Sequence, residues 1–424
     1  MKFISLLHRF NFSQGILATL AEVFYYGIIF LTSVVVARVY GATSFGQYSV
    51  NFFLVSILVN IGNSGFTAIL RKKLSCSEAN EYSGYIQSYF LLRVAFGLLL
   101  FFSGTFYLHL TQTDSLAMIV LFVPLFFSRF IDGLTEIIHS VFVVNDRFQV
   151  YFQMKLVYCI CCLLIIGIAL VVKIDIKWFY WILTIPSLVM LLISSYQLDF
   201  LSTDRINIKT SIVIESIRES WPLLIHAGIF AIYSRYWIFY SDTIFTKHEV
   251  ATLSAAMIIV SSIALVPNAI GAMCFPKLCR LANQASSDEL RIFVTKMVIF
   301  MAITGLVIAI GVYILTPLMP YMFGEVGYES ILYLKILCAS LIPTFAMSII
   351  GYLTTAINSQ KVGLIIVALI SVASIPIYAL LASLMGLIGI ALGYVVMQYF
   401  SIAMASIYLF VWFANRKMSA VTNG

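Results

Sequence analysis

Four ionisable side chains interrupt an apolar stretch that is long enough to cross a lipid bilayer. Arg129, Asp132, Glu136 and His139 lie within "LAMIVLFVPLFFSRFIDGLTEIIHSVFVV". On a helix they share one face, a sector of about 80°. A charge at the bilayer centre costs about 2.5 to 3.5 kcal/mol on insertion scales, so this face is expected to meet partners or a water-filled cavity inside a helix bundle.

These side chains are expected at different depths in the membrane. If their helix runs from outside to inside, Arg129 lies near the midplane, and the other three step toward the cytoplasm by about 1.5 Å per residue. Arg129 and Asp132 are also i, i+3 neighbours. A structural ion-pair network that only neutralises charge is therefore an alternative to a binding role.

Other apolar stretches also hold ionisable residues. The segment "YSRYWIFYSD" places Arg235 and Asp242 seven residues apart, on one helical face. Asp242 alternatively anchors the outer end of its helix. Glu22 and Arg93 are predicted to be buried as well, although Arg93 could instead extend its long side chain toward the cytoplasmic surface.

The composition requires that these residues be positioned by membrane-spanning helices. The chain is 62% hydrophobic and 10% charged, with a mean hydropathy of +1.03, whereas soluble domains carry about 25% charged residues. Apolar runs of about 20 residues cross the hydrocarbon layer as helices, and these runs are too long for barrel strands. The fold class is therefore an all-α polytopic membrane protein.

Apolar runs and their breaks predict about twelve spans. Four of them contain a proline that is a predicted kink point, namely Pro124, Pro186, Pro267 and Pro343. The approximate limits are 14–37, 46–69, 84–108, 116–143, 150–172, 178–198, 220–245, 250–275, 293–316, 331–356, 363–383 and 388–413.

Six spans precede the longest connector and six follow it. This organisation predicts an N-terminal lobe (1–198), a cytoplasmic, partly amphipathic connector (199–219) and a C-terminal lobe (220–424). The N-terminus is expected to be an uncleaved amphipathic lead on the cytoplasmic surface, because no separate cleavable core precedes the first span. No connector is large enough for a catalytic domain.

The net charge of +7 is explained by topology rather than by binding to nucleic acid. Most connector lysines and arginines fall on the side of the N-terminus, which places both termini in the cytoplasm. The seven cysteines are odd in number and lie mostly in or beside spans, so neither a disulfide framework nor a metal site is predicted. The chain also lacks a GxxxxGK[ST] phosphate loop, and no cofactor is expected.

The two halves resemble each other when the chain is shifted by about 205 residues. Residues 45–74 then lie over 250–279, with Ser49 on Ser254 and Lys72 on Lys277. An even number of spans per half makes the repeats parallel, with a substrate cavity expected between them.

Sequence motifs add a resemblance to a known family. The stretch "VARVYGATSFGQYSV" (36–50) is similar to the A-R-x-x-G-x-x-x-F-G-x-Y signature of polysaccharide exporters in the multidrug/oligosaccharidyl-lipid/polysaccharide (MOP) superfamily. Residues 241–278 resemble the family's next motif, in which Leu253 replaces the usual Tyr. The segments 324–337, 355–365 and 386–396 also follow the family.

The resemblance implies a Wzx-type flippase with a MATE- or MurJ-like fold of two six-helix repeats around a central cavity. The implied substrate is an undecaprenyl-diphosphate-linked oligosaccharide repeat unit for O-antigen or capsular polysaccharide. It would move from the inner to the outer leaflet of the bacterial cytoplasmic membrane, without enzymatic activity. A polysaccharide polymerase and a chain-length regulator are implied partners.

A diphosphate head group requires forked cationic donors, which arginine supplies. The predicted diphosphate contacts are Arg129 and Arg235, with Arg93 as a third and Arg38 as a contact for release or a structural part of its turn. Coupling to H⁺ or Na⁺, or charge partnering, is assigned to the carboxylates Asp132, Glu136, Asp242 and Glu22. Outward movement of an anion is itself favoured by about 2.3 kcal/mol per charge per 100 mV.

Two other functions remain open at this point. A MATE-like exporter of organic cations would favour a cavity with excess carboxylate, whereas here buried arginines roughly balance the acids. A membrane-embedded polymerase or acyltransferase would be expected to present acids, histidines or arginines on an ordered outer loop. The longest outer connector (316–330) holds only Glu325 and Glu329.

Overall fold

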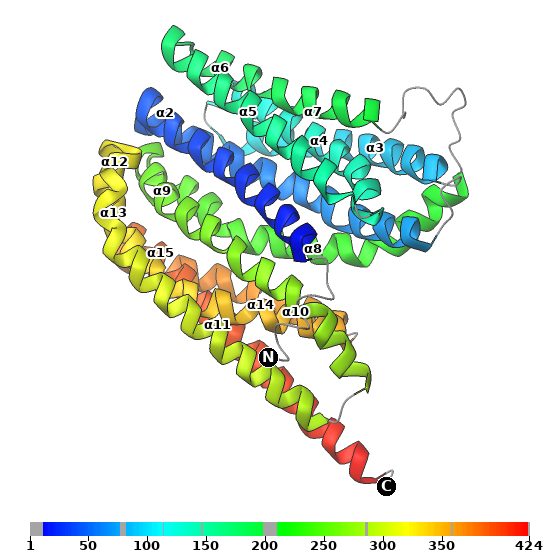
Figure 1. Ribbon diagram of the computed structural model, residues 1–424. Coiled ribbons are helices and arrows are strands. Elements are labelled where there is room, and N and C mark those ends of the chain that lie inside the picture. The colour runs from blue at the N-terminus through cyan, green and yellow to red at the C-terminus, as the bar shows by residue number, and fades with distance from the viewer. Residues whose placement is uncertain are drawn as a thin grey trace. The chain divides into compact units, whose positions relative to one another are not determined.

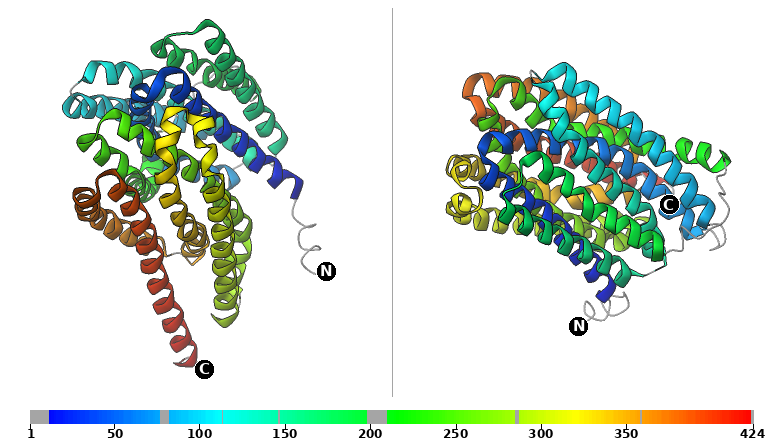
Figure 2. Two further views of the ribbon diagram at one scale, coloured as in Figure 1. Left: turned by 90° about the vertical axis from the view of Figure 1, so that its left-hand side faces the viewer. Right: turned by 90° about the horizontal axis from the view of Figure 1, so that it is seen from above.

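A computed structural model describes residues 12–76, 82–112, 114–145, 147–197, 210–284, 287–357 and 359–422. These residues form helices and short turns, and no strand occurs among them (Figures 1 and 2). The predicted all-α class is confirmed. The amphipathic lead, apart from its last residues, and residues 199–209 of the predicted connector lie outside the described residues.

The chain divides into two compact units. Unit 1 consists of Met1–Tyr40 and Gln47–Ala231, and unit 2 of Gly41–Gly46 and Ile232–Gly424. Helices α2 and α8 contribute residues to both units. The lobes predicted from the span count stay a prediction.

Unit 1 is built mainly from α2 through α7 and the first part of α8. The helix bounds are α2 (Phe12–Cys76), α3 (Tyr82–Thr111), α4 (Ser115–Val144), α5 (Phe148–Val172), α6 (Ile176–Ile182), α7 (Thr184–Gln197) and α8 (Thr210–Ile244).

Unit 2 contains the rest of α8 and the helices that follow it. Their bounds are α9 (Lys247–Ile263), α10 (Leu265–Gln284), α11 (Ser287–Leu315), η2 (Thr316–Leu318), α12 (Met319–Phe323), α13 (Glu325–Leu337), η3 (Cys338–Ser340), α14 (Leu341–Ala356) and α15 (Gln360–Thr422).

Glycines break the two longest helices where the sequence predicts span boundaries. Gly41 interrupts α2 with φ 83°, and Gly386 interrupts α15 with φ 60°. Side chains with a Cβ rarely adopt positive φ, so glycine allows the chain to leave the helix at these points. The first two predicted spans therefore correspond to the two parts of α2, and the last two to the two parts of α15.

Prolines account for three further breaks. Pro186, Pro267 and Pro343 are each the third residue of a new helix, α7, α10 and α14. Proline has no backbone N–H and clashes with the preceding turn, but it is tolerated in the first turn of a helix. Three predicted kink points are thus helix starts, whereas Pro124 lies inside the continuous helix α4.

Eight stretches of the described chain are long and apolar enough to cross a membrane. They lie at 20–63, 82–111, 115–144, 148–172, 176–197, 288–323, 325–356 and 361–415. The first and last contain the breaks at Gly41 and Gly386. The predicted spans 220–245 and 250–275 correspond to α8 and to α9 with α10, which are not among the eight.

The start of α8 packs against α2 and α3 within unit 1. Ile212 belongs to a buried apolar cluster with Leu70 and Leu74 of α2 and Tyr89 of α3. Beside this cluster, the Lys73 ammonium donates to carboxylates on two successive turns of α8. Lys73 Nζ lies 2.6 Å from Glu215 Oε1 and 2.8 Å from Glu219 Oε1.

Close helix contacts in unit 2 depend on glycine. A Cβ on Gly46 would overlap the backbone carbonyl of Lys247, and one on Gly327 would overlap that of Met319. The start of α9 is fixed by a capping box, in which Thr246 and Glu249 satisfy each other's backbone N–H groups. Gly46 is one of the glycines of the sequence motif at 36–50, and the close approach of the Lys247 backbone explains why a residue without a side chain is needed there.

Candidate functional site

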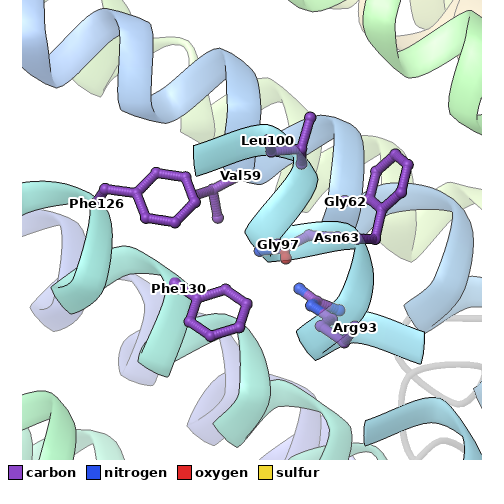
Figure 3. Close-up of a pocket in the computed structure, with 9 residues that line it drawn as sticks. Val59, Gly62, Asn63, Arg93, Gly97, Leu100, Phe126 and Phe130 are labelled. Atoms are coloured by element: carbon purple, nitrogen blue, oxygen red, sulfur yellow. The ribbon is translucent and has the colours of Figure 1, made fainter. Parts of the chain in front are cut away.

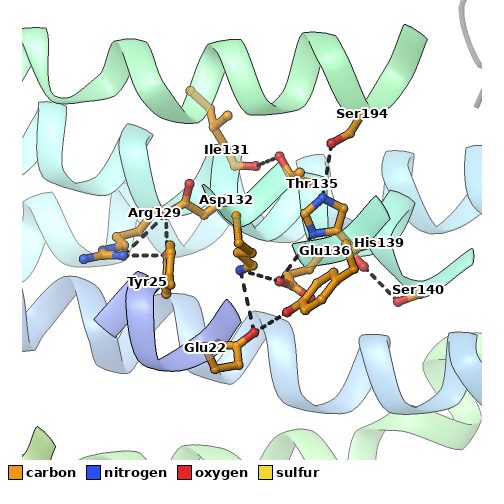
Figure 4. Close-up of polar contacts among 12 residues, drawn as sticks. Glu22, Tyr25, Arg129, Ile131, Asp132, Thr135, Glu136, His139, Ser140 and Ser194 are labelled. Atoms are coloured by element: carbon orange, nitrogen blue, oxygen red, sulfur yellow. Dashed lines mark hydrogen bonds and ion pairs between the residues drawn. The ribbon is translucent and has the colours of Figure 1, made fainter. Parts of the chain in front are cut away.

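The polar face predicted on α4 meets α2 and α5 inside unit 1 (Figure 4). Its side chains form two adjacent groups. The Arg129 group consists of Tyr25, Arg129 and Asp132. The Lys155 group consists of Glu22, Glu136, His139, Tyr151 and Lys155.

In the Arg129 group, a tyrosine hydroxyl links a cation to an anion. The Arg129 NH1 donates to the Tyr25 hydroxyl at 2.6 Å, and Tyr25 in turn donates to Asp132 Oδ2 at 2.6 Å. Arg129 NH1 also lies 3.4 Å from the same carboxylate oxygen. The Arg129 side chain keeps 19% of its surface exposed. The predicted i, i+3 neighbours therefore interact, and Tyr25 completes the arrangement.

In the Lys155 group, one ammonium lies between two carboxylates. Lys155 Nζ is 3.0 Å from Glu136 Oε1 and 3.9 Å from Glu22 Oε1, while its side chain is only 4% exposed. Tyr151 donates its hydroxyl to Glu22. His139 Nδ1 lies 3.8 Å from Glu136. Burial makes each of these charges dependent on the others.

Neighbouring side chains extend the Lys155 group toward the C-terminal end of α4. Arg71 NH2 lies 3.4 Å from Glu136 Oε2, and Arg71 Nε is 3.3 Å from Ser140 Oγ. The other ring nitrogen of His139 is 3.1 Å from Ser194 Oγ of α7. His139 is fully buried, and its contacts fix its ring between α4 and α7.

Tyr25 also connects the two groups. Lys155 Nζ lies 4.1 Å from the centroid of the Tyr25 ring, within the range of a cation–π interaction. The guanidinium carbon of Arg129 lies 5.7 Å from the same centroid. One buried side chain thus contacts both cations and, through its hydroxyl, Asp132.

The remaining predicted site residues lie elsewhere. Arg93 on α3 is buried in unit 1, where it donates to Thr67, and Arg38 is exposed just before the break at Gly41. Arg235 belongs to unit 2, with NH1 3.4 Å from Ser261 Oγ. Asp242, also in unit 2, forms an ion pair with Lys247 at the junction of α8 and α9. The structure thus gathers Arg129, Asp132, Glu136 and Glu22 in unit 1.

Sequence reasoning missed Lys155, Tyr25 and Tyr151. Lys155 carried a signal, since it is a lysine six residues into the predicted span 150–172 and has tyrosines four residues before and three after it. An intramembrane lysine is as strong a pointer to function as an arginine. The two tyrosines carried no such signal, because aromatic residues are common in spans.

A metal centre finds no support in the described part of the chain. No group of three or more His, Cys, Asp or Glu side chains gathers there with the geometry to hold an ion. In the Lys155 group, an ammonium rather than a metal ion balances the two carboxylates.

Solved structures show the class of fold. An inward-facing MATE family multidrug transporter of the MOP superfamily superimposes with a TM-score of 0.77 at 13% identity, over 93% of this chain and 95% of that one. The lipid II flippase MurJ, in an inward closed conformation, gives 0.70 at 15% identity over 96% and 91%. A MOP superfamily transporter from Pyrococcus furiosus, described as having a binding pocket of reverse polarity, gives 0.66 at 11% over 95% and 96%. The fold is that of MOP superfamily transporters.

Sequence comparison narrows this class to a family. The family model described as "Polysaccharide biosynthesis protein" matches residues 13–282, and the chain belongs to this family. A search of curated proteins found no significant match. The family and fold expected from the motifs are confirmed, and the protein is a multi-pass membrane protein with the fold of a MOP transporter.

Proposed function

We propose that the protein flips undecaprenyl-diphosphate-linked oligosaccharides from the inner to the outer leaflet of the bacterial cytoplasmic membrane, for O-antigen or capsular polysaccharide. Both termini lie in the cytoplasm in this proposal. A polymerase and a chain-length regulator act on the product. The family assignment supports a role in polysaccharide synthesis.

The observation that carries the proposal is the partial use of the hydrogen-bond donors of Arg129. Its hydrogen bonds and ion pair within the described chain, to Tyr25 and Asp132, all go through NH1, while part of the side chain is exposed. An arginine has five N–H donors in a fixed fork. The donors on Nε and NH2 are therefore available to grip a phosphate in the bidentate geometry that arginine favours.

The charge balance around this residue also suits an anion. Within α2 to α5, seven lysines and arginines stand against three carboxylates, Glu22, Asp132 and Glu136. The cations are Arg38, Arg71, Lys72, Lys73, Arg93, Arg129 and Lys155. A cavity for organic cations would require the opposite balance. Arg235 remains a proposed second diphosphate contact and Arg38 a proposed contact for release.

Ion coupling is proposed for the carboxylates. Glu22, with 41% of its side chain exposed, shares Lys155 with Glu136, so a proton or Na⁺ at one carboxylate would weaken the hold of Lys155 on that group. Asp132 and Asp242 are further candidates, with Arg129 and Lys247 as their respective partners. The membrane potential also favours outward movement of the anionic head group.

The test is the sidedness of lipid-linked glycans in a strain that lacks the gene. Impermeant labelling of sugars in spheroplasts and inverted vesicles, followed by mass spectrometry, should find the glycan on the cytoplasmic face. The wild-type gene should restore export, whereas Arg129→Ala and Arg235→Ala should not, at normal protein level. Arg291→Ala, which removes an exposed arginine of α11, is the matched control and should export normally.

Three results would contradict the proposal. Glycan that reaches the outer face unpolymerised in the deletion strain would leave flipping intact and favour an enzyme of the same pathway. Undiminished export from Arg129→Ala would remove the diphosphate contact. A strain that exports glycan normally but loses resistance to organic cations would instead identify a MATE-like exporter.

A further inference from the structure

His139 is a buried titratable side chain that has no role in the proposed function (Figure 4). Its side chain is fully buried, and Nε2 lies 3.1 Å from Ser194 Oγ of α7. Nδ1 is buried without a hydrogen-bond partner in the described chain and faces Glu136 Oε1 at 3.8 Å. Histidine is the side chain whose ordinary pKa, about 6.5, lies closest to physiological pH. A ring in this position can therefore change its charge under cellular conditions.

The protonated ring matches the groups on both of its sides. A neutral imidazole has one N–H and one acceptor nitrogen. If Nε2 carries the hydrogen, the lone pair of Nδ1 faces another acceptor, the carboxylate of Glu136. If Nδ1 carries it, the N–H stops short of that carboxylate, because 3.8 Å is too long for a hydrogen bond. The imidazolium donates from both nitrogens, and its charge attracts Glu136 into a charge-assisted hydrogen bond while Ser194 accepts from Nε2.

Charged and polar side chains face His139 from the helices around α4. They are Glu136 of α4 itself, Glu22 and Arg71 of α2, Arg93 of α3, Tyr151 and Lys155 of α5, and Ser194 of α7. Arg93 lies farther along α4, near Gly133, where it lines a small pocket with Asn63 (Figure 3). Within 4.0 Å, Glu136 is the charged group that the His139 ring meets in the described chain. Glu136 is therefore the counter-ion for a proton on His139.

A proton is held with less loss on His139 than on Glu136. Glu136 faces Lys155 at 3.0 Å and Arg71 at 3.4 Å, and protonation of its carboxylate would forfeit both ion pairs. Protonation of His139 forfeits neither. Burial of the ring opposes its charge and the carboxylate favours it, so the two states are balanced against each other.

The proton can reach the buried ring through Glu136. The Glu136 side chain keeps 23% of its surface exposed, whereas His139 has none. In the transfer, the O–H bond of the transiently protonated carboxyl group breaks, the N–H bond at Nδ1 forms, and the carboxylate is restored. Glu136 thus serves as the entrance and, afterwards, as the counter-ion.

The added charge would act on Lys155, because both cations face the same oxygen. Glu136 Oε1 lies 3.0 Å from Lys155 Nζ and 3.8 Å from His139 Nδ1. Two cations at one oxygen repel each other, and a second carboxylate oxygen, Glu22 Oε1, lies 3.9 Å from Lys155 Nζ. Proton uptake by His139 therefore favours movement of the ammonium from Glu136 on α4 to Glu22 on α2.

We infer that His139 takes up the coupling proton at Nδ1, with Glu136 as its counter-ion, and that this proton transfers the hold of Lys155 from α4 to α2. The inference rests on the proposed function for the existence of ion coupling, and it selects H⁺ over Na⁺. An imidazole nitrogen accepts a proton, whereas hard metal cations prefer several oxygen ligands. Glu136 and Glu22 act as the charge partners of this step.

The first measurement follows the His139 proton on the purified full-length protein. The protein is labelled with ¹⁵N-histidine, and NMR spectra are recorded in detergent micelles between about pH 5 and pH 8. The chain has five histidines, and the resonances lost in His139→Gln identify the ring. His139 should change from a neutral ring to an imidazolium in this range. Glu136→Gln should make proton uptake about tenfold weaker, and Lys155→Met, which removes the competing cation, should make it stronger.

The second measurement tests whether this proton drives flipping. Farnesyl diphosphate with a fluorescent nitrobenzoxadiazole group is the probe, and quenching by impermeant dithionite reports its flipping in proteoliposomes. The wild-type rate should change with pH over the range in which His139 titrates, and a sodium gradient should not alter it. His139→Gln should lose the pH dependence. His109→Gln, which removes an exposed histidine in the last turn of α3, is the matched control and should keep the wild-type profile.

The outcomes separate the inference from the proposed function. A neutral His139 throughout the pH range, or a wild-type pH profile in His139→Gln, overturns the inference. A flat profile in Glu22→Gln with a normal profile in His139→Gln assigns the proton to the carboxylate instead. Flipping that follows the sodium gradient and ignores pH replaces the proton by Na⁺. If wild type does not flip the probe, the proposed function fails, and the NMR titration alone decides whether His139 holds a proton. That titration also decides if His139→Gln is inactive at every pH.

Discussion

Replacement of Lys155 by methionine should destabilise the protein by about 3 kcal/mol. At an effective dielectric constant of about 20, the attraction of Lys155 to Glu136 at 3.0 Å is about 5.5 kcal/mol, and to Glu22 at 3.9 Å about 4.3 kcal/mol. Desolvation of the ammonium offsets much of this, and loss of one partner of a buried pair usually costs about 3 to 5 kcal/mol. Arg71 still faces Glu136 but is 39% exposed, which places the expected effect at the lower end.

A double variant tests whether this loss arises from the charge left behind. Glu136→Gln combined with Lys155→Met removes both charges, so it should be less destabilised than Lys155→Met alone. The free energy of unfolding can be measured in mixed micelles by titration with sodium dodecyl sulfate. If the two single effects simply add, or if Lys155→Met changes stability by less than about 1 kcal/mol, the buried ion pair is not what couples α4 to α5.

Two further predictions concern packing and pH. Gly46→Ala would press a Cβ into the backbone carbonyl of Lys247 and should destabilise the protein by about 1 to 3 kcal/mol. Gly27→Ala, whose Cβ would have no atom within 4 Å, should stabilise it by about 0.5 to 1 kcal/mol. Equal shifts of the two variants in thermal unfolding would contradict this reasoning. Near the start of α8, the hydrogen bond from Lys73 lowers the pKa of Glu219, and hydrogen bonds to Glu215 and Glu219 raise the pKa of Lys73. These contacts should contribute at most about 1 kcal/mol of stability, because the groups are partly exposed. The contribution should be present above the unfolded carboxyl pKa of about 4.3 and lost as pH falls below it. At the alkaline end it should be lost as pH rises through the raised pKa of Lys73. The stability difference between wild type and Glu219→Gln should therefore shrink between about pH 5 and pH 3, and a constant difference would contradict the assignment.

Much of the helical architecture could be predicted from the sequence because it is set by local properties. Apolar length alone places α3, α4 and α5 within a few residues of the predicted spans. Gly41 and Gly386 break helices because of backbone freedom, which is a property of the residue itself. The split of the span 178–198 into α6 and α7 was signalled by Pro186, although its form, a new helix start rather than a kink, was not.

The predicted repeat has a counterpart in burial. Ser49 and Ser254, which the 205-residue shift superimposes, are both fully buried and both lack a hydrogen-bond partner for the hydroxyl within the described chain. Lys72 and Lys277, the other matched pair, are both exposed. Equivalent positions in the two segments thus have equivalent surroundings, as expected for a repeat.

The candidate site was predicted in part. Helical periodicity correctly places Arg129 beside Asp132, since both lie on α4 and one turn fixes their separation. The partners supplied by α2 and α5 depend on which helices pack together, and the pairing of helices cannot be predicted from their apolar sequences. Lys155 was therefore missed as a counter-ion, and the pairing of Glu22 with Glu136 through it was not foreseen.

The position of Tyr25 links the Arg129 group and the Lys155 group of unit 1. Its hydroxyl belongs to one ion pair and its ring face to the other, so the first part of α2 cannot slide relative to α4 and α5 without disturbing both. Interactions that are lost together behave as one switch with two states rather than as a series of independent contacts. Binding or protonation at one ion pair would then change the strength of the other without any change in the intervening helix backbone. This coupling is the same in both directions.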